Sequence, residues 1–383
     1  MTTATRPRRP SSTEHPAALG SFRSWMQLLF RSRGVDARFL PRALFVALTT
    51  LATTPLRLWE AARYGRRIRR MTSHPAPVFI VGHWRSGTTH LQNLLCQDER
   101  FGYLSTFQAM APGFFLIGDR TIKRLVARVA RSRYPTRLID NIPLAFDAPQ
   151  EDEFALANLS PCSFVHSFSF PRQAREIFNR NVLLRGPSAH RTRWRERYRT
   201  LLRKTTLACG GKRLILKNCA HSARIPTLLD LFPDAKFIHI HRNPYDVYLS
   251  TLHMHRTVLA RSQLQRVDPR QLEENVLVFY EGLLTRFLED RTRIPEANLV
   301  EVRFEDLEAA PLAELRRIYD AFDLPAFGAA EPELRAYMDS ISDYRKNVYR
   351  RDLSDIERVN TRWGFAFDAF GYDRLDPTPP AGP

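Results

Sequence analysis

Residues 82–89 of this 383-residue chain read GHWRSGTT, a composition typical of a loop that binds an anion. Its two glycines allow the backbone to fold tightly around an anion, and a following helix would direct free N–H groups at it. Thr88 and Thr89 add hydroxyl donors, and Arg85 adds a positive charge. A loop built for magnesium triphosphate needs a lysine directly after the second glycine, where this chain has Thr88. The loop therefore predicts a phosphate-like ligand rather than a nucleoside triphosphate.

A second candidate anchor for an anion lies in the segment RNPYDVYLS, which begins at Arg242 and ends at Ser250. Pro244 is tolerated in the first turn of a helix, so Ser250 would lie about two turns along that helix. A loop arginine and a helix serine can converge on one phosphate, although Arg242 could instead form an ion pair with Asp246. The two anchors together predict a ligand with two separate anionic groups.

Several side chains could transfer a proton or stabilise charge beside these anchors. Lys217 ends an apolar run, and His221 follows it by four residues. The acids Glu151, Asp152 and Glu153 form a second cluster, in which Glu153 adjoins an apolar stretch where burial would raise a carboxyl pKa. The sequence leaves the choice of general base open between His221 and this cluster, with Glu153 favoured among the acids. Each also has a purely structural interpretation, at a helix start.

The elements that must position these residues follow from the apolar periodicity. Short β-branched runs predict buried parallel strands at residues 78–81, 213–217, 236–240 and 299–302. Helical patterns follow them at 88–97, 221–232, 244–255 and 311–322. Alternating strands and helices predict an α/β fold with a central parallel sheet flanked by helices on both faces.

The remaining segments suggest how the chain is organised around this sheet. We expect a disordered tail at residues 1–20, a basic helical extension at 21–72, the main domain at 73–375 and a second disordered tail at 376–383. The irregular segment 110–205 would cover the carboxyl ends of the strands, where ligands bind in open α/β sheets, and form an acceptor pocket.

The extension is strongly basic, with 14 arginines, no lysine and three acids in residues 1–70. An apolar helix followed by arginines could lie on an anionic membrane surface, or it could pack on the main domain. The apolar run is shorter than the ~20 residues that span a bilayer. Both interpretations of residues 21–72 stay open.

The net charge and the cysteine and histidine content bear on the ligands, location and metals that the protein can have. A formal charge of +18 indicates an attraction to polyanions, but it does not choose among them. The four cysteines, Cys96, Cys162, Cys209 and Cys219, form no zinc-binding spacing and suit a reducing cytoplasm. His239 and His241 alternate on a predicted strand without matching acids nearby in sequence, so no metal is predicted.

The strings WRSGTT and RNPYDVYLS, in this order and spacing, resemble those of the sulfotransferases that use 3′-phosphoadenosine 5′-phosphosulfate (PAPS). The likeness spans about residues 77–375 and is nearest to bacterial members related to tyrosylprotein and carbohydrate sulfotransferases. Trp84 stands where the family usually has proline. The resemblance implies a sulfotransferase-like fold with a P-loop, and it assigns the two ends of the donor. The 5′ end would contact Arg85, Ser86, Gly87, Thr88 and Thr89, the 3′-phosphate would contact Arg242 and Ser250, and a basic segment with Arg345 and Lys346 would close over the nucleotide.

The same resemblance implies in-line transfer of a sulfuryl group to a hydroxyl, with Arg85 stabilising the leaving group and Lys217 acting as a second cation. Relatives with an arginine in the loop often carry a glutamate some twenty residues later, where this chain has Gln108, which cannot be a base. The acceptor would be a glycan, a lipid or another metabolite, with an amphiphilic one favoured, and nucleic acid is not expected. Two alternatives remain: a kinase-like nucleotide enzyme, and a non-catalytic basic protein that binds membrane or nucleic acid.

Overall fold

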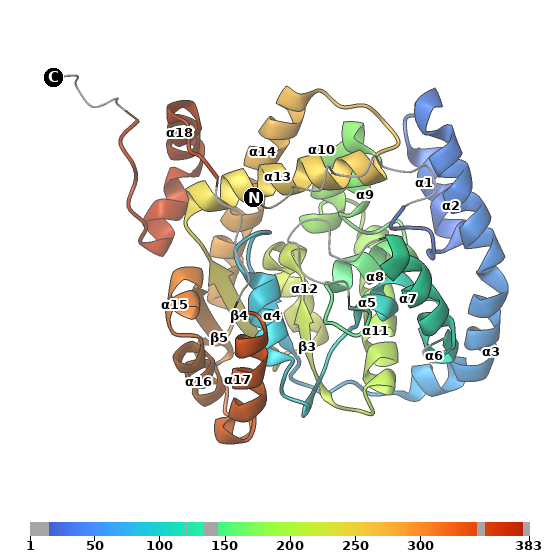
Figure 1. Cartoon of the computed structure of the whole chain (residues 1–383), viewed down its shortest axis with the longest axis horizontal. Coiled ribbons are helices and arrows are strands. Elements are labelled where there is room, and N and C mark those ends of the chain that lie inside the picture. Colours follow the sequence, from blue (N-terminus) through green and yellow to red (C-terminus); the bar gives the residue numbers. More distant parts are fainter. Residues whose placement is uncertain (1–14, 119–120, 134–144, 343–348, 378–383) are drawn as a thin grey trace.

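The computed structural model describes residues 15–118, 121–133, 145–342 and 349–377. Its core is one parallel sheet of five strands in the order β2-β3-β1-β4-β5 (Figure 1). The four predicted strands are present as β1 (Val78–Val81), β3 (Arg213–Lys217), β4 (Lys236–His241) and β5 (Leu299–Arg303). The strand β2 (Phe101–Gly102) was missed, because two residues are too short to show any periodicity.

Both faces of the sheet are covered, as the apolar runs require. Val78 and Ile80 of β1 point into a cluster with α4 (Thr88–Leu95), α16 (Pro311–Ala321) and α17 (Glu331–Ser340). Phe79 and Val81 point to the opposite face, into a cluster with α11 (Ser188–Ala208), α12 (Ile225–Leu231) and the end of α14 (Pro269–Asp290). Alternate residues of one strand therefore bury on both sides, which confirms the predicted α/β architecture.

Three long helices frame the carboxyl ends of β1 and β4. The helix α13 (Pro244–Ser262) follows β4 and packs with α14 and α18 (Leu353–Phe370). Trp363 of α18 is fully buried and stacks on Tyr280 of α14, with ring centroids 3.6 Å apart. Because α18 lies more than a hundred residues after β4, this packing brings the C-terminal region of the chain against the helix that carries Ser250.

The expected insertion, residues 110–205, is a set of helices rather than an irregular loop. It begins at the end of α5 (Thr106–Met110), and an antiparallel bridge links Ser105, just before α5, to Pro149 inside the insertion. Its helices, up to the long α11, are α6 (Phe115–Gly118), α7 (Thr121–Arg133), α8 (Asp152–Leu159), α9 (His166–Ser169) and α10 (Ala174–Ile177). The helix α8 lies against α5 and α11, next to the end of β3.

The N-terminal segment forms α1 (Phe22–Arg31), α2 (Leu40–Ala52) and α3 (Thr54–Arg70) along one flank of the molecule (Figure 1). The prediction of a disordered tail at residues 1–20 is wrong for residues 15–20. His15 is buried, its Nε2 lies 3.0 Å from the carbonyl oxygen of Ser262, and Ser21 caps α1. Composition alone predicted disorder here, whereas a single buried histidine anchors the segment to α13.

Shorter elements complete the described chain, namely α15 (Phe304–Ala309) and single turns at Ala37–Phe39, Pro171–Gln173, Phe178–Val182, Cys219–Ala223, Arg291–Arg293, Glu296–Asn298 and Phe327–Ala329. Of the predicted C-terminal tail, 376–383, the structure describes only residues 376 and 377.

Candidate active site

The loop 82–89 joins the end of β1 to the start of α4, as its sequence predicted. Both glycines are required by close contacts. A Cβ on Gly82 would lie 2.2 Å from the carbonyl oxygen of Ile240, and one on Gly87 would lie 2.2 Å from the ring of Phe304. Gly87 is also the N-cap of α4, with a φ of 93° and no side chain to cap the helix. The first amides of α4 are therefore left to an external acceptor, which suits an anion.

Arg85 is held in an unusual conformation inside this loop. Its φ of 71° lies in the left-handed region, which costs a residue with a side chain roughly 1–2 kcal/mol. Its Nε donates a hydrogen bond to the hydroxyl of Ser250, at 2.9 Å. The fold thus brings together residues 165 positions apart, one from each predicted anchor.

The second anchor also contacts Phe304. Arg242 follows β4, and its guanidinium carbon lies 4.6 Å from the centre of the Phe304 ring, whose edge contacts Gly87. Arg242 also forms the ion pair with Asp246 that the sequence suggested, at 3.6 Å. Its Nε is buried and has no hydrogen-bond partner among the described residues. Phe304 therefore contacts both the loop, at Gly87, and Arg242 of the second anchor.

The predicted closing residues Arg345 and Lys346 lie outside the described residues, but the chain next to them returns to α13. Arg351 pairs with Asp246 at 2.6 Å, and the ring of Tyr349 lies 5.8 Å from that of His253. Asp246 and His253 flank Ser250 on the same helix. The described chain therefore resumes, at Tyr349, close to the second anchor.

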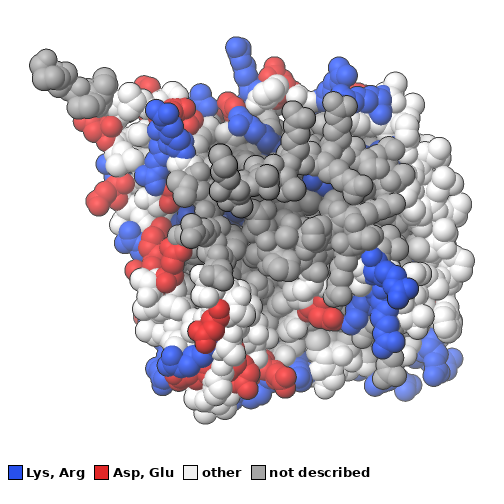
Figure 2. Space-filling model, viewed as in Figure 1, with Lys and Arg blue, Asp and Glu red and all other residues white. Residues whose placement is uncertain are grey.

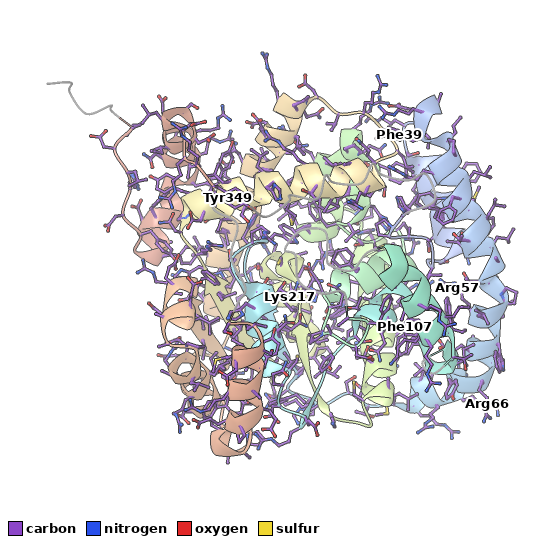
Figure 3. The ribbon with its side chains drawn as sticks, viewed as in Figure 1. Phe39, Arg57, Arg66, Phe107, Lys217 and Tyr349 are labelled. Carbon is purple, nitrogen blue, oxygen red and sulfur yellow. The ribbon has the colours of Figure 1, made fainter. Side chains whose placement is uncertain are left out.

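Lys217, the last residue of β3, lies near the centre of the molecule (Figure 3). It pairs across the sheet with Ile80, two residues before the loop. Its Nζ contacts Glu151 Oε2 at 2.7 Å, and both side chains are almost fully buried. Two residues further on, Cys219 Sγ lies 3.6 Å from Thr88 Oγ1. The Lys217–Glu151 ion pair is consequently beside the anion-binding loop.

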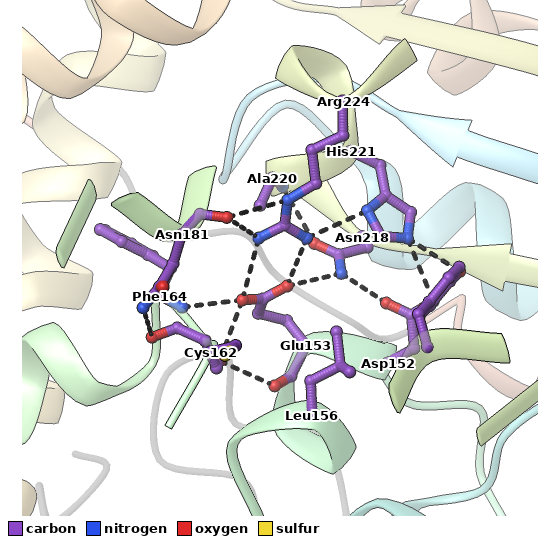
Figure 4. A network of polar contacts seen from close by, with 12 residues as sticks. Asp152, Glu153, Leu156, Cys162, Phe164, Asn181, Asn218, Ala220, His221 and Arg224 are labelled. Carbon is purple, nitrogen blue, oxygen red and sulfur yellow. Dashed lines mark hydrogen bonds and ion pairs between the residues drawn. The ribbon is translucent and has the colours of Figure 1, made fainter. Parts of the chain in front are cut away.

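Glu153 occupies a different environment, a buried polar network beneath the site (Figure 4). Its carboxylate pairs with Arg224 at 2.8 Å and accepts hydrogen bonds from Asn218, Ser163 and the amide of Phe164. Burial alone would raise the pKa of Glu153, but Arg224 and these donors outweigh it and lower the pKa to about 2. A carboxylate held this way is a very weak base, which argues against the role predicted for Glu153.

His221 belongs to the same network and is fully buried. Its Nε2 lies 2.8 Å from the hydroxyl of Tyr198, which donates to Asp152, and its Nδ1 lies 3.2 Å from Arg224 Nη1. Because an arginine can only donate, Nδ1 must accept, and no nitrogen lone pair remains to take a substrate proton. The geometry thus argues against His221 as the base as well.

The sequence could not show that three consecutive acids point to different places. Successive residues at the start of a helix are turned by about 100°. Asp152 and Glu153 therefore turn into the network, and Glu151, at the N-cap of α8, reaches Lys217. The sequence placed Glu151 in the candidate cluster but favoured Glu153, and it gave no sign of Asn218 and Arg224, which hold Asp152 and Glu153 in the network.

Gln108 and the loop residue His83 both have surroundings that indicate a structural role. Gln108 forms a capping box with Ser105 at the start of α5. His83 is buried against Tyr280 and Trp84, and this burial lowers its pKa to about 3. Among the residues that the structure describes, no group of three or more metal-ligating side chains converges, and His239 instead lies 3.3 Å from Glu301.

Comparison with known proteins identifies the class of this fold and site. The model of the sulfotransferase family matches residues 77–328, more than half of the chain. The omega-hydroxy-beta-dihydromenaquinone-9 sulfotransferases Stf3 of Mycobacterium bovis and of Mycobacterium tuberculosis are each 33% identical to the chain over 362 residues. Those alignments cover 94% of this chain and 92% of each relative. The chain therefore belongs to the sulfotransferase family, and it is a sulfotransferase.

Solved structures agree on the fold. Sulfotransferase STF9 of Mycobacterium avium superimposes with a TM-score of 0.70 at 19% identity, covering 93% of this chain and 97% of that one. Sulfotransferase STF1 of Mycobacterium tuberculosis gives a TM-score of 0.66 at 20% identity, covering 93% and 94%. The similarity extends over the N-terminal helices as well as the sheet.

Proposed function

We propose that this enzyme transfers the sulfuryl group of PAPS to the hydroxyl of an amphiphilic, lipid-like acceptor. The assignment of PAPS as the donor rests on the hydrogen bond between Arg85 and Ser250. It joins the loop at the end of β1 to the helix after β4, so one ligand can contact both anion sites. PAPS has a phosphosulfate at its 5′ end and a phosphate at its 3′ end, so it offers one anionic group to each of the two anchors.

In this proposal the two ends of the donor have different protein partners. Ser86, Gly87, Thr88 and Thr89 bind the 5′ end through the start of α4, and Arg242 and Ser250 bind the 3′-phosphate. Arg345 and Lys346 close over the nucleotide. The buried Nε of Arg242, which lacks a partner among the described residues, supports this assignment, since a bound phosphate would accept from it.

The transfer forms a bond between the acceptor oxygen and sulfur, and it breaks the bond from sulfur to the bridging oxygen. The electron pair leaves with the 5′-phosphate. Arg85 stabilises charge on that leaving group, and Lys217 does so on the sulfuryl oxygens. Neither has to donate a proton, so positioning and charge supply the catalysis, as in phosphoryl transfer.

Glu151 is the base in this scheme. Its carboxylate is buried beside the loop and, in the part of the chain that the structure describes, forms an ion pair with Lys217. When Lys217 moves onto the sulfuryl oxygens, the carboxylate of Glu151 is released from its ion pair and is free to face the acceptor hydroxyl. Binding of the donor would in this way prepare Glu151 to accept the hydroxyl proton.

The acceptor class rests on the apolar surroundings of the loop. Trp84 packs on Phe164, with ring centroids 4.7 Å apart, and Phe164 contacts Phe168 and Phe279. A small cavity lies beside these rings, between Phe168, His255 and Leu259. The Stf3 relatives are named for a menaquinone-derived acceptor, which is itself an amphiphile. The four free thiols suit a cytoplasmic location.

The test is direct. The purified enzyme is incubated with ³⁵S-labelled PAPS and a series of ω-hydroxylated isoprenoid lipids and simple sugars, and the labelled product is identified by mass. Calorimetry compares the binding of adenosine 3′,5′-bisphosphate with that of ATP. We expect sulfation of a lipid and tighter binding of the bisphosphate. Tighter binding of ATP than of the bisphosphate would refute PAPS as the donor. Sulfation of sugars alone would refute a lipid-like acceptor.

A further inference from the structure

The outer face of α2 and α3 carries an unusual concentration of exposed apolar side chains. Ten large apolar residues are exposed among those described, and seven of them lie between residues 30 and 59. Six form a stripe along α2 and α3, the apolar stripe: Leu40, Leu44, Leu48, Leu51, Leu58 and Trp59. Along α2 the spacing of three or four residues places Leu40, Leu44, Leu48 and Leu51 on one side of the helix, and Leu58 and Trp59 are exposed about two turns further on, in α3.

Both ends of the apolar stripe are basic. Arg31, Arg33 and Arg38 are exposed before it, and the end of α3 exposes Arg63, Arg66, Arg67, Arg69 and Arg70. The nearby acids are not free to offset this charge, because Glu60 is buried against Lys204 and Asp36 is paired with Arg172. Figure 2 shows an uncharged margin over these helices with basic residues at its lower corner, where Figure 3 labels Arg66.

The opposite face of these helices is fixed to the protein. Phe39, Ala43 and Val46 are buried with Trp25 of α1, and Arg42 donates to the carbonyl of Gln263 at 3.0 Å. On α3, Glu60 accepts from the amide of Leu116 at 2.6 Å and pairs with Lys204. The stretch Ala37–Arg70 is long and apolar enough to cross a membrane by length and composition. Crossing would, however, strip Glu60 of these partners inside hydrocarbon, at a high energetic cost.

From these features we infer that α2 and α3 form a docking surface for an anionic phospholipid bilayer, on which they lie flat. The apolar stripe enters the boundary between headgroups and acyl chains, and the flanking arginines contact the lipid phosphates. A second copy of this chain would be a weaker partner, since a self-complementary contact along the stripe would bring the two sets of arginines near each other without facing acids.

The same helices connect to the proposed acceptor site. Trp25, which packs under α2, lies 6.3 Å from Phe170, and Phe168 contacts Phe164, which contacts Trp84 of the anion-binding loop. Aromatic side chains therefore lie between the docking surface and Trp84. This link to a membrane-borne acceptor rests on the proposed function, whereas the docking surface does not.

The experiment measures partition of the full-length enzyme onto sedimented vesicles of phosphatidylglycerol and phosphatidylcholine, with pure phosphatidylcholine as comparison. We expect binding only with the anionic lipid, and a loss with rising salt. Leu44→Glu/Leu48→Glu should reduce the partition coefficient at least tenfold, and Arg66→Glu/Arg67→Glu should do so at low salt. Leu353→Glu, at an exposed leucine of α18, is the matched control and should bind as wild type does.

Binding of adenosine 3′,5′-bisphosphate, measured in parallel, shows that each variant is folded and separates this inference from the donor assignment. The inference is overturned if wild type ignores anionic vesicles, or if Leu44→Glu/Leu48→Glu binds them as well as Leu353→Glu does. It is also overturned if light scattering shows a dimer of the wild type that this double variant converts to a monomer. That result would assign the apolar stripe to self-association.

Discussion

Replacing Glu153 by glutamine separates a structural from a catalytic role for an almost fully buried acid beneath the site. The change removes the negative charge and leaves the guanidinium of Arg224, 1% exposed, without its carboxylate. Breaking a buried ion pair in this way costs about 3–5 kcal/mol. Folded domains are stable by only about 5–15 kcal/mol, so the variant should lose a large part of its free energy of unfolding.

The assay is equilibrium unfolding in urea followed by tryptophan fluorescence. Trp194 is a suitable reporter, because Arg224 lies over its ring at 4.8 Å. The matched control is Glu314→Gln, which breaks the more exposed pair with Arg317 and should cost about 0–1 kcal/mol. In the double variant Glu153→Leu/Arg224→Met, the cost should fall below the sum of the single changes, because neither charge is left alone.

The opposite pattern would refute this reasoning. If Glu153→Gln unfolds within about 1 kcal/mol of wild type but loses transfer more than a hundredfold, then Glu153 is the base, and general base catalysis is typically worth about 10²–10⁴. Under our interpretation that loss belongs to Glu151→Gln instead, with kcat reduced in a variant that still binds adenosine 3′,5′-bisphosphate.

Three further predictions concern the loop, the second anchor and acid stability. Arg85→Ala should lower kcat by at least about 10²-fold, and Arg85→Gly should be equally inactive yet more stable than Arg85→Ala by about 0.4–1 kcal/mol in urea, since glycine accepts the φ of 71°; equal stabilities would contradict the strain assigned there. Arg242→Ala should weaken binding of adenosine 3′,5′-bisphosphate far more than that of adenosine 5′-phosphate, measured by calorimetry, and an equal loss for both would remove Arg242 from the 3′-phosphate. Burial lowers the pKa of His15 and of His83 from 6.5 to about 3, so the unfolded chain binds more protons between these values, and the free energy of unfolding should begin to fall below pH 6.5. Glu153, with its pKa lowered from 4.5 to about 2, adds a loss between pH 4.5 and 2 that Glu153→Gln should lack, and a pH-independent stability from 7 to 4 would contradict the histidine part.

The fold was predictable because its signals are local. Runs such as residues 78–81 are apolar on both faces, and only a sheet covered on both sides buries them. The loop after β1 was predictable for a similar reason, since glycines and hydroxyls in sequence become neighbours in space. The convergence of Arg85 and Ser250 was also within reach, because both follow neighbouring parallel strands whose carboxyl ends share one edge of the sheet.

The sequence could not show the direction in which each side chain points or the partners that lie far away along the chain, and the remaining features depend on both. Glu151, Asp152 and Glu153 are alike in composition, and their roles are set by Lys217, Asn218 and Arg224, which lie more than sixty residues away. The order at residues 15–20 likewise depends on distant partners, since His15 contacts Ser262, 247 positions away, and the carbonyl of Leu19 accepts a hydrogen bond from Arg57. Neither contact leaves a periodic or compositional signal in the segment that it fixes.

The position of Arg85 shows how the fold would prepare the donor site that we propose. Its left-handed backbone is unfavourable by itself, and it persists because neighbouring contacts determine it. Gly82 sits against Ile240, Gly87 against Phe304, and Ser222 accepts from the amide of Gly82 at 2.8 Å, so little freedom is left to the residues between. The hydrogen bond to Ser250 then orients the guanidinium. Because these constraints belong to the protein, a bound donor need not order the arginine itself, and more of its binding energy remains for the transfer.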